Sequence, residues 1–139
     1  MRFLVGVDGS EPSRRACEFA AELANASGAQ VKVVFVRHVP ATAGLATGAA
    51  GLMAEALDEQ ESAVKEIVDS TLKDGPGYWT TETKDGGDIG AAIDTAAQDW
   101  GADLIIVGSR GYHGAHRLLA GSVSTELVHR AHLPVLVVR

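Results

Sequence analysis

One stretch of the sequence, from Gly108 to Ser124, concentrates residue types that bind anions. Glycines at positions 108, 111 and 121 allow a backbone to approach a ligand closely. A predicted helix begins directly after Gly121, and the free N–H groups of a helix's first turn attract negative charge. Ser122 and Ser124 add two hydroxyl donors to that turn. Glycines alone would also suit tight turns, but glycines at both ends of the stretch, with serines at a helix start, favour a phosphate site.

Two arginines bring positive charge into the same stretch. Arg110 and Arg117 stand out because the chain as a whole has a formal net charge of −6. The sequence contains no Gly-x-x-x-x-Gly-Lys-Ser/Thr motif, so it lacks the lysine with which a P-loop contacts the terminal phosphate. We therefore expect phosphate binding without rapid hydrolysis of the P-loop type. His113 and His116 lie here too, but no cysteine or acidic residue accompanies them at metal-ligand spacing.

A second candidate is Asp8, which follows the first apolar run of the chain. Its carboxylate could accept hydrogen bonds from ribose hydroxyls or hold a divalent cation. The alternative is a structural role, in which Asp8 caps the next helix or orders the turn that precedes it.

The elements that would position these residues alternate along the chain. Apolar runs predict strands at residues 3–7, 31–39, 104–107 and 135–138, and an alternating pattern predicts a strand at the edge of the sheet at residues 78–83. Helix periodicity separates them, beginning with apolar residues at positions 16, 19, 20, 23 and 24 between a Ser10 cap and a Gly28 stop. A longer helix is marked from Met53 to Leu72, a third lies between Asp88 and Gly101, and a fourth spans residues 123–131. Residues 40–51, rich in Ala, Gly and Thr, are expected to be a connection.

Alternation of this kind predicts an α/β fold with a doubly wound parallel sheet and helices on both faces. In such sheets, ligands bind beyond the carboxyl ends of the strands, where the winding direction reverses. Asp8 and Gly108 each follow a predicted strand end, so both are candidates for that crevice.

Composition limits the alternatives. A chain of 139 residues has the size of one domain, residues 1–139, and its 46% hydrophobic and 22% charged residues are typical of globular proteins. The acidic balance disfavours nucleic acid or an anionic membrane as the main partner. No apolar run is long enough for a spanning helix or a signal peptide, so we expect a cytoplasmic protein.

The glycine spacing carries a resemblance to a known family. Gly108-x-x-Gly111, nine residues and then Gly121-Ser122 resemble the glycine signature of the ATP-binding branch of the universal stress protein family. The rest of the chain is similar too, at Val7-Asp8-Gly9-Ser10, Gly87-Asp88-Ile89 and Leu133-Pro134-Val135.

The resemblance implies a five-stranded sheet of order 3-2-1-4-5 and a site for ATP, with Mg²⁺ carried by the nucleotide near Asp8. It implies that Gly6, Val7 and Asp8 meet the adenosine. Around the ribose and phosphates it implies a set that extends from the end of the fourth strand to the last helix: Val107, Gly108, Arg110, Gly111, Gly121, Ser122, Val123 and Ser124. In the family a small apolar residue usually lines the adenine pocket at the end of the second strand; this chain has His38 there, whose imidazole could stack on adenine. A homodimer through the apolar edge strand Val135–Val138 is also implied.

Four functions are compared with these observations. The leading hypothesis is a stress-response or signalling module that binds adenine nucleotide and is read by a regulatory protein partner. The second is a slow ATPase or an adenylyl- or phosphoryl-transfer enzyme, for which Asp8 with Mg²⁺ is the candidate centre. A receiver domain would need an acidic pair after the first strand and an aspartate after the third, whereas this chain offers Asp8 and then Asp85 and Asp88. A nucleotide-free structural dimer remains if the glycines only make turns.

Overall fold

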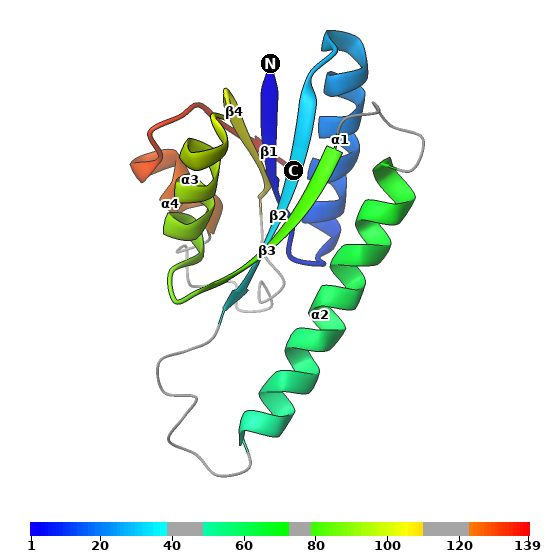
Figure 1. Ribbon diagram of the computed structural model, residues 1–139, viewed down its shortest axis with the longest axis vertical. Helices are drawn as coiled ribbons and strands as arrows, with labels where there is room; N and C mark the ends of the chain where they lie inside the picture. The colour runs from blue at the N-terminus through cyan, green and yellow to red at the C-terminus, as the bar shows by residue number, and fades with distance from the viewer. Residues whose placement is uncertain (39–48, 73–78, 110–122) are drawn as a thin grey trace.

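A computed structural model describes residues 1–38, 49–72, 79–109 and 123–139 of the chain. These residues form five strands and four helices that alternate along the chain (Figure 1). In order, they are β1 (Arg2–Gly6), α1 (Glu11–Ser27), β2 (Gln30–His38), α2 (Ala49–Leu72), β3 (Trp79–Gly86), α3 (Ile89–Trp100), β4 (Leu104–Gly108), α4 (Val123–Arg130) and β5 (Val135–Val138).

The strands form one parallel sheet of order β3-β2-β1-β4-β5, which confirms the expected α/β architecture. Alternate residues of each strand face opposite layers, as the pleat requires. Phe3 and Val5 of β1 pack with α1 and α2 on one face, whereas Leu4 packs with α3 and α4 on the other. Both layers bury their side chains, so the central strands are apolar on both faces.

The helix boundaries follow local capping rules, as predicted. Ser10 caps α1 by accepting the backbone N–H of Ser13, and Gly28 ends α1 in the left-handed conformation at φ 70°. At α3 the cap is Asp88, whose carboxylate accepts the backbone N–H of Ala91. That bond lowers the pKa of Asp88 below its ordinary value. Gly101 ends α3 with a positive φ of 69°.

The start of α2, the end of β3 and the exposure of Phe19 differ from what the sequence pattern predicts. α2 already includes residues 49–51, which we assigned to the connection. Three of the first four residues of this helix are small, and two of them are alanines, which favour helix formation. β3 continues to Gly86 rather than residue 83, because its last residues pair with the long end of β2. Phe19 of α1 is 41% exposed, since the face turned to the sheet includes Ser13 and Cys17.

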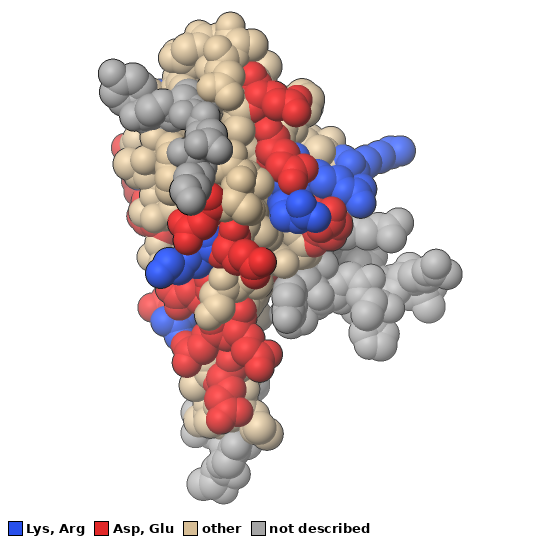
Figure 2. All heavy atoms as spheres, turned by 90° about the vertical axis from the view of Figure 1, so that its right-hand side faces the viewer, with Lys and Arg blue, Asp and Glu red and all other residues tan. Residues whose placement is uncertain are grey.

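None of the described helices is both long and apolar enough to cross a membrane. Figure 2 shows the side of the molecule that carries α1 and α2, where acidic side chains extend over much of the surface.

Candidate functional site

The carboxyl ends of β1 and β4 lie side by side. Gly6 of β1 is in register with Val107 of β4, and the backbone N–H of Val7 continues the ladder to the carbonyl of Val34 at 3.0 Å. On the other side of β4, Ser109 donates its backbone N–H to Val138 at 2.7 Å. The strand order reverses between β1 and β4, so this edge is the crevice at which α/β sheets bind ligands.

Asp8 lies directly beyond β1 and is held by its own turn. Its Oδ1 accepts the backbone N–H of Ser10 at 3.0 Å and the Ser10 hydroxyl at 2.5 Å. The backbone N–H of Asp8 donates to Oγ of Ser13 at 3.3 Å. The structural role considered for Asp8 is therefore present, and the same bonds fix the orientation of its carboxylate at the strand edge. Contact between Asp8 and a nucleotide or Mg²⁺ stays a prediction.

Two of the predicted site glycines have a packing role as well. A Cβ atom on Gly108 would lie 2.6 Å from the carbonyl carbon of Pro12, so only a glycine lets the first turn of α1 rest on the end of β4. A Cβ on Gly6 would lie 3.0 Å from Cδ1 of Ile93 in α3. The sequence suggested that glycine at position 108 serves a ligand's approach; contact with the backbone of α1 is a sufficient physical reason for that glycine. At Gly6 the nearest atoms belong to side chains, which would have to shift by only a few tenths of an ångström.

The first turn of α4 begins at the same edge. Oγ of Ser124 donates to the backbone carbonyl of Ser109 at 3.3 Å, and Ser124 is buried. Val123 packs against the layer that contains α3. The predicted phosphate contacts Arg110, Gly111, Gly121 and Ser122 lie outside the described residues, as do Arg117, His113 and His116.

His38 ends β2, four residues beyond the level at which β1 stops, and pairs there with Gly86 of β3. Its Nδ1 is buried and makes no hydrogen bond within the described part of the chain. A buried nitrogen without a partner is costly, and a ligand atom at this edge could satisfy it.

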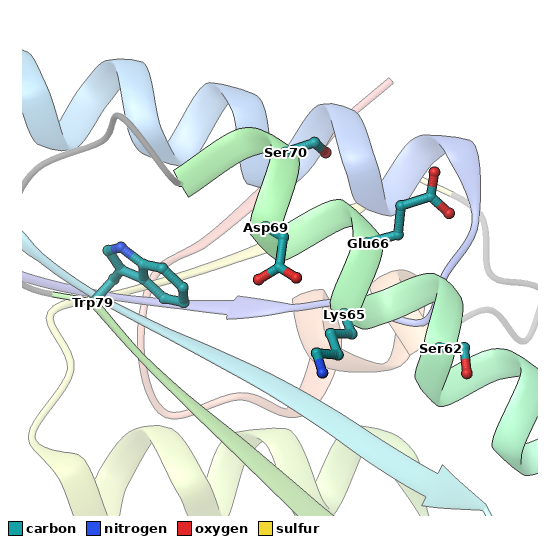
Figure 3. A pocket seen from close by; sticks show the side chains of 6 residues that line it. All are labelled: Ser62, Lys65, Glu66, Asp69, Ser70 and Trp79. Atoms are coloured by element: carbon teal, nitrogen blue, oxygen red, sulfur yellow. The ribbon is translucent and has the colours of Figure 1, made fainter.

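A separate hollow of about 780 Å³ lies along α2 and is lined by Ser62, Lys65, Glu66, Asp69, Ser70 and Trp79 (Figure 3). Trp79 is the first residue of β3, so the hollow lies toward the amino ends of the strands. In Figure 3, the carboxylate of Asp69 and the ammonium of Lys65 face the same opening as the indole. Because two acidic residues accompany one lysine, this hollow does not favour phosphate. Among the residues described, no group of three or more His, Cys, Asp or Glu could hold a metal ion.

Sequence reasoning missed one residue that contacts the site. Nε2 of Gln60 in α2 donates to the backbone carbonyl of Asp8 at 2.9 Å. The available signal was position: Gln60 lies between Leu57 and Val64 at helical spacing, so it is a polar residue within the inner stripe of α2.

Comparisons with known proteins agree with this geometry. The profile of the Universal stress protein family matches residues 1–139. A universal stress protein of Methanocaldococcus jannaschii is 31% identical over 139 residues, covering 99% of this chain and 81% of the relative. One from Synechocystis is 29% identical, with 99% and 97% coverage.

Solved structures share the fold. UspA from Lactobacillus plantarum has a TM-score of 0.77 at 24% identity and covers 100% of this chain and 97% of its own. A universal stress protein described as a complex with cAMP scores 0.75 at 24% identity, with the same coverage. An Archaeoglobus fulgidus universal stress protein described as a complex with dAMP scores 0.66 at 24% identity, with 100% and 98% coverage. The family match over the whole chain, the curated relatives and the shared sheet order place this chain in the universal stress protein family.

Proposed function

We propose that this chain is a cytoplasmic binding module for adenine nucleotide, with ATP as its ligand, and that it serves a stress response or signal rather than fast catalysis. The nucleotide would lie across the carboxyl ends of β1 and β4, between Asp8 and the first turn of α4.

One observation carries this proposal. The strand order reverses between β1 and β4, and both the Asp8 turn and the start of α4 lie at that edge. A carboxylate suits ribose hydroxyls, whereas the first turn of a helix suits phosphates. The site therefore offers complementary groups for two polar parts of a nucleotide, its ribose and its phosphates.

The fit extends to single atoms. The Ser10 bonds orient the Asp8 carboxylate before any ligand arrives, which reduces the ordering cost of binding. The buried Nδ1 of His38, which has no hydrogen-bond partner among the residues that the structure describes, is a group that a base or sugar could satisfy. Arg110 and Ser122 would meet the phosphates, and Asp8 would meet a Mg²⁺ ion carried with them. The two related structures described with cAMP and dAMP support adenine as the base.

Calorimetric titration of ATP, dAMP and cAMP into the purified protein tests the proposal. We expect Asp8→Asn, which keeps Oδ1 as an acceptor for Ser10, to weaken ATP binding at least about tenfold, since a hydrogen bond to a charged group contributes roughly 1.5–3 kcal/mol. Asp58→Asn, an exposed acid on α2, is the matched control and should bind as wild type. If none of the three nucleotides binds wild-type protein, the proposal is wrong.

The same preparation separates binding from catalysis. Mass spectrometry of the released ligand should find intact ATP, and turnover should be slow or undetectable. Steady-state turnover above roughly one per second, the low end of ordinary enzymes, would favour the ATPase or transferase alternative instead.

We further infer that two copies associate through β5. This strand is apolar and stands at the edge of the sheet, where unpaired backbone groups can bond a second strand. Its four residues are each partly exposed. Light scattering at micromolar concentration should report twice the 14.4 kDa of one chain.

A further inference from the structure

α2 contacts the candidate site at the turn that follows β1. The amide nitrogen Nε2 of Gln60 donates to the carbonyl of Asp8 at 2.9 Å, and this bond is partly buried. It joins residues 52 positions apart in the sequence. The β1–α1 turn is therefore attached to α2 as well as to its own flanking elements.

Packing beside that bond leaves little room for the turn to move independently. Gly9 has a φ of +86°, and a Cβ at this position would lie 3.1 Å from Cβ of Ala63 and 3.3 Å from the carbonyl of Gln60. The backbone of the turn thus rests directly on α2 at Gln60 and Ala63, beside the hydrogen bond from the Gln60 side chain to Asp8. Displacement of either element changes this contact.

Gln60 also lies at a boundary within α2. Its described buried residues are Val64, Ile67, Val68 and Leu72, all C-terminal to Gln60. N-terminal to it the helix is largely exposed, with Leu52 at 72%, and Figure 1 shows this part extending past the carboxyl ends of the strands. Gln60 is therefore placed where the packed part of α2 gives way to the exposed part.

We infer that Gln60 is a positioning residue that couples the nucleotide site to α2. It holds the Asp8 turn in the binding geometry, and occupation of that turn in return steadies α2 around Gln60. This inference rests on the proposed nucleotide site. Because such coupling is reciprocal, a change that stabilises α2 around Gln60 would tighten nucleotide binding by the factor by which nucleotide stabilises that part of α2.

Gln60→Met tests the coupling, because methionine keeps an unbranched chain of similar length but donates no hydrogen bond. Gln98→Met is the control: Gln98 in α3 loses the hydrogen bonds of its side-chain amide, from Nε2 to Asp94 at 2.9 Å and to His132 at 3.1 Å, away from the carboxyl ends of the strands. For Gln60→Met we expect ATP binding to weaken about three- to tenfold, the span of one net hydrogen bond. Gln98→Met should bind as wild type. Thermal unfolding of each variant checks that it is folded.

Hydrogen exchange supplies a measurement that a purely structural role would not change. In wild type, ATP should slow amide exchange both in the Asp8 turn and in residues 57–64 of α2; in Gln60→Met, it should slow the turn only. If folded Gln60→Met binds ATP with wild-type affinity and α2 still responds to ATP, the coupling is refuted.

Failure of the nucleotide site itself gives a different result. If wild type binds no nucleotide, the proposed function is wrong, and exchange without ligand then decides the role of Gln60. Faster exchange at the amides of Ser10 and Ser13 in Gln60→Met, but not in Gln98→Met, would retain Gln60 as the residue that holds the turn; unchanged exchange at both would overturn it.

Discussion

Substitution of Gly108 by alanine is the sharpest test of how the site edge is built. The added Cβ would lie 2.6 Å from the carbonyl carbon of Pro12, 2.7 Å from its oxygen and 2.8 Å from the nitrogen of Ser13. All three are backbone atoms of the first turn of α1, so no side-chain rotation can relieve the contact. To restore an ordinary separation of 3.4 Å, the helix start and β4 must move apart by roughly 0.8 Å.

Two effects of opposite sign set the magnitude. Overpacking of this kind costs about 1–3 kcal/mol, and contact with three backbone atoms places it toward the upper end. The φ of Gly108 is not in the left-handed region, so alanine restricts the unfolded chain and returns about 0.4–1 kcal/mol. The packing cost dominates. We expect a net loss of about 2 kcal/mol in the free energy of unfolding, or roughly 6–10 °C in Tm for a chain of this length.

Urea unfolding followed by circular dichroism measures this difference, with Gly87→Ala as the matched control. A Cβ on Gly87 meets nothing within 4 Å, and its φ is not in the left-handed region, so that variant should be as stable as wild type or slightly more stable. If Gly108→Ala lies within about 0.5 kcal/mol of wild type at an unchanged denaturant slope, our account of this glycine is refuted.

Three further predictions address binding, assembly and pH. Gly121→Val should abolish ATP binding in calorimetry while circular dichroism shows a folded protein, because a β-branched side chain would obstruct phosphates before α4; binding within about threefold of wild type would contradict this. Val137→Lys places a charge in the edge strand β5 and should give a monomer in light scattering, whereas Val128→Lys, at an exposed position of α4, should leave the dimer intact. The hydrogen bond from Lys32 to Glu82 at 3.1 Å lowers the pKa of Glu82 in the folded protein. The ion pair therefore stabilises the fold fully at a pH above the ordinary pKa of 4.5, and this stabilisation is lost as the pH falls through the lower pKa of the folded state. The stability difference between wild type and Glu82→Gln should therefore shrink over that acid range, and a difference independent of pH would show that the ion pair contributes nothing.

The helix ends show what local sequence predicts well. Ser10 and Asp88 cap their helices, and Gly28 and Gly101 end them, as expected, because each cap depends on atoms within a few residues of it. The apolar runs likewise predicted buried parallel strands, since only a chain covered on both faces tolerates continuous apolar residues.

Pairing between distant segments caused the errors. Residues 84–86 carry Lys, Asp and Gly, which are unlike a strand, yet they continue β3 because β2 extends past β1 and offers them backbone partners. Phe19 fits the apolar period of α1, but the buried face of the helix includes Ser13 and Cys17 and leaves Phe19 41% exposed. Periodicity identifies an apolar stripe and leaves its exact centre open.

At the candidate site, the sequence by itself determined which residues follow the strand ends, and the glycine spacing with Asp8 predicted where a nucleotide would be bound. Only the tertiary structure decided that Gly6 and Gly108 are close-packing positions, and that Gln60 of a distant helix bonds the carbonyl of Asp8. The reason is physical: a strand end or a cap is set by neighbours along the chain, whereas the space beside a glycine and the partner of a backbone carbonyl are set by whichever element packs there.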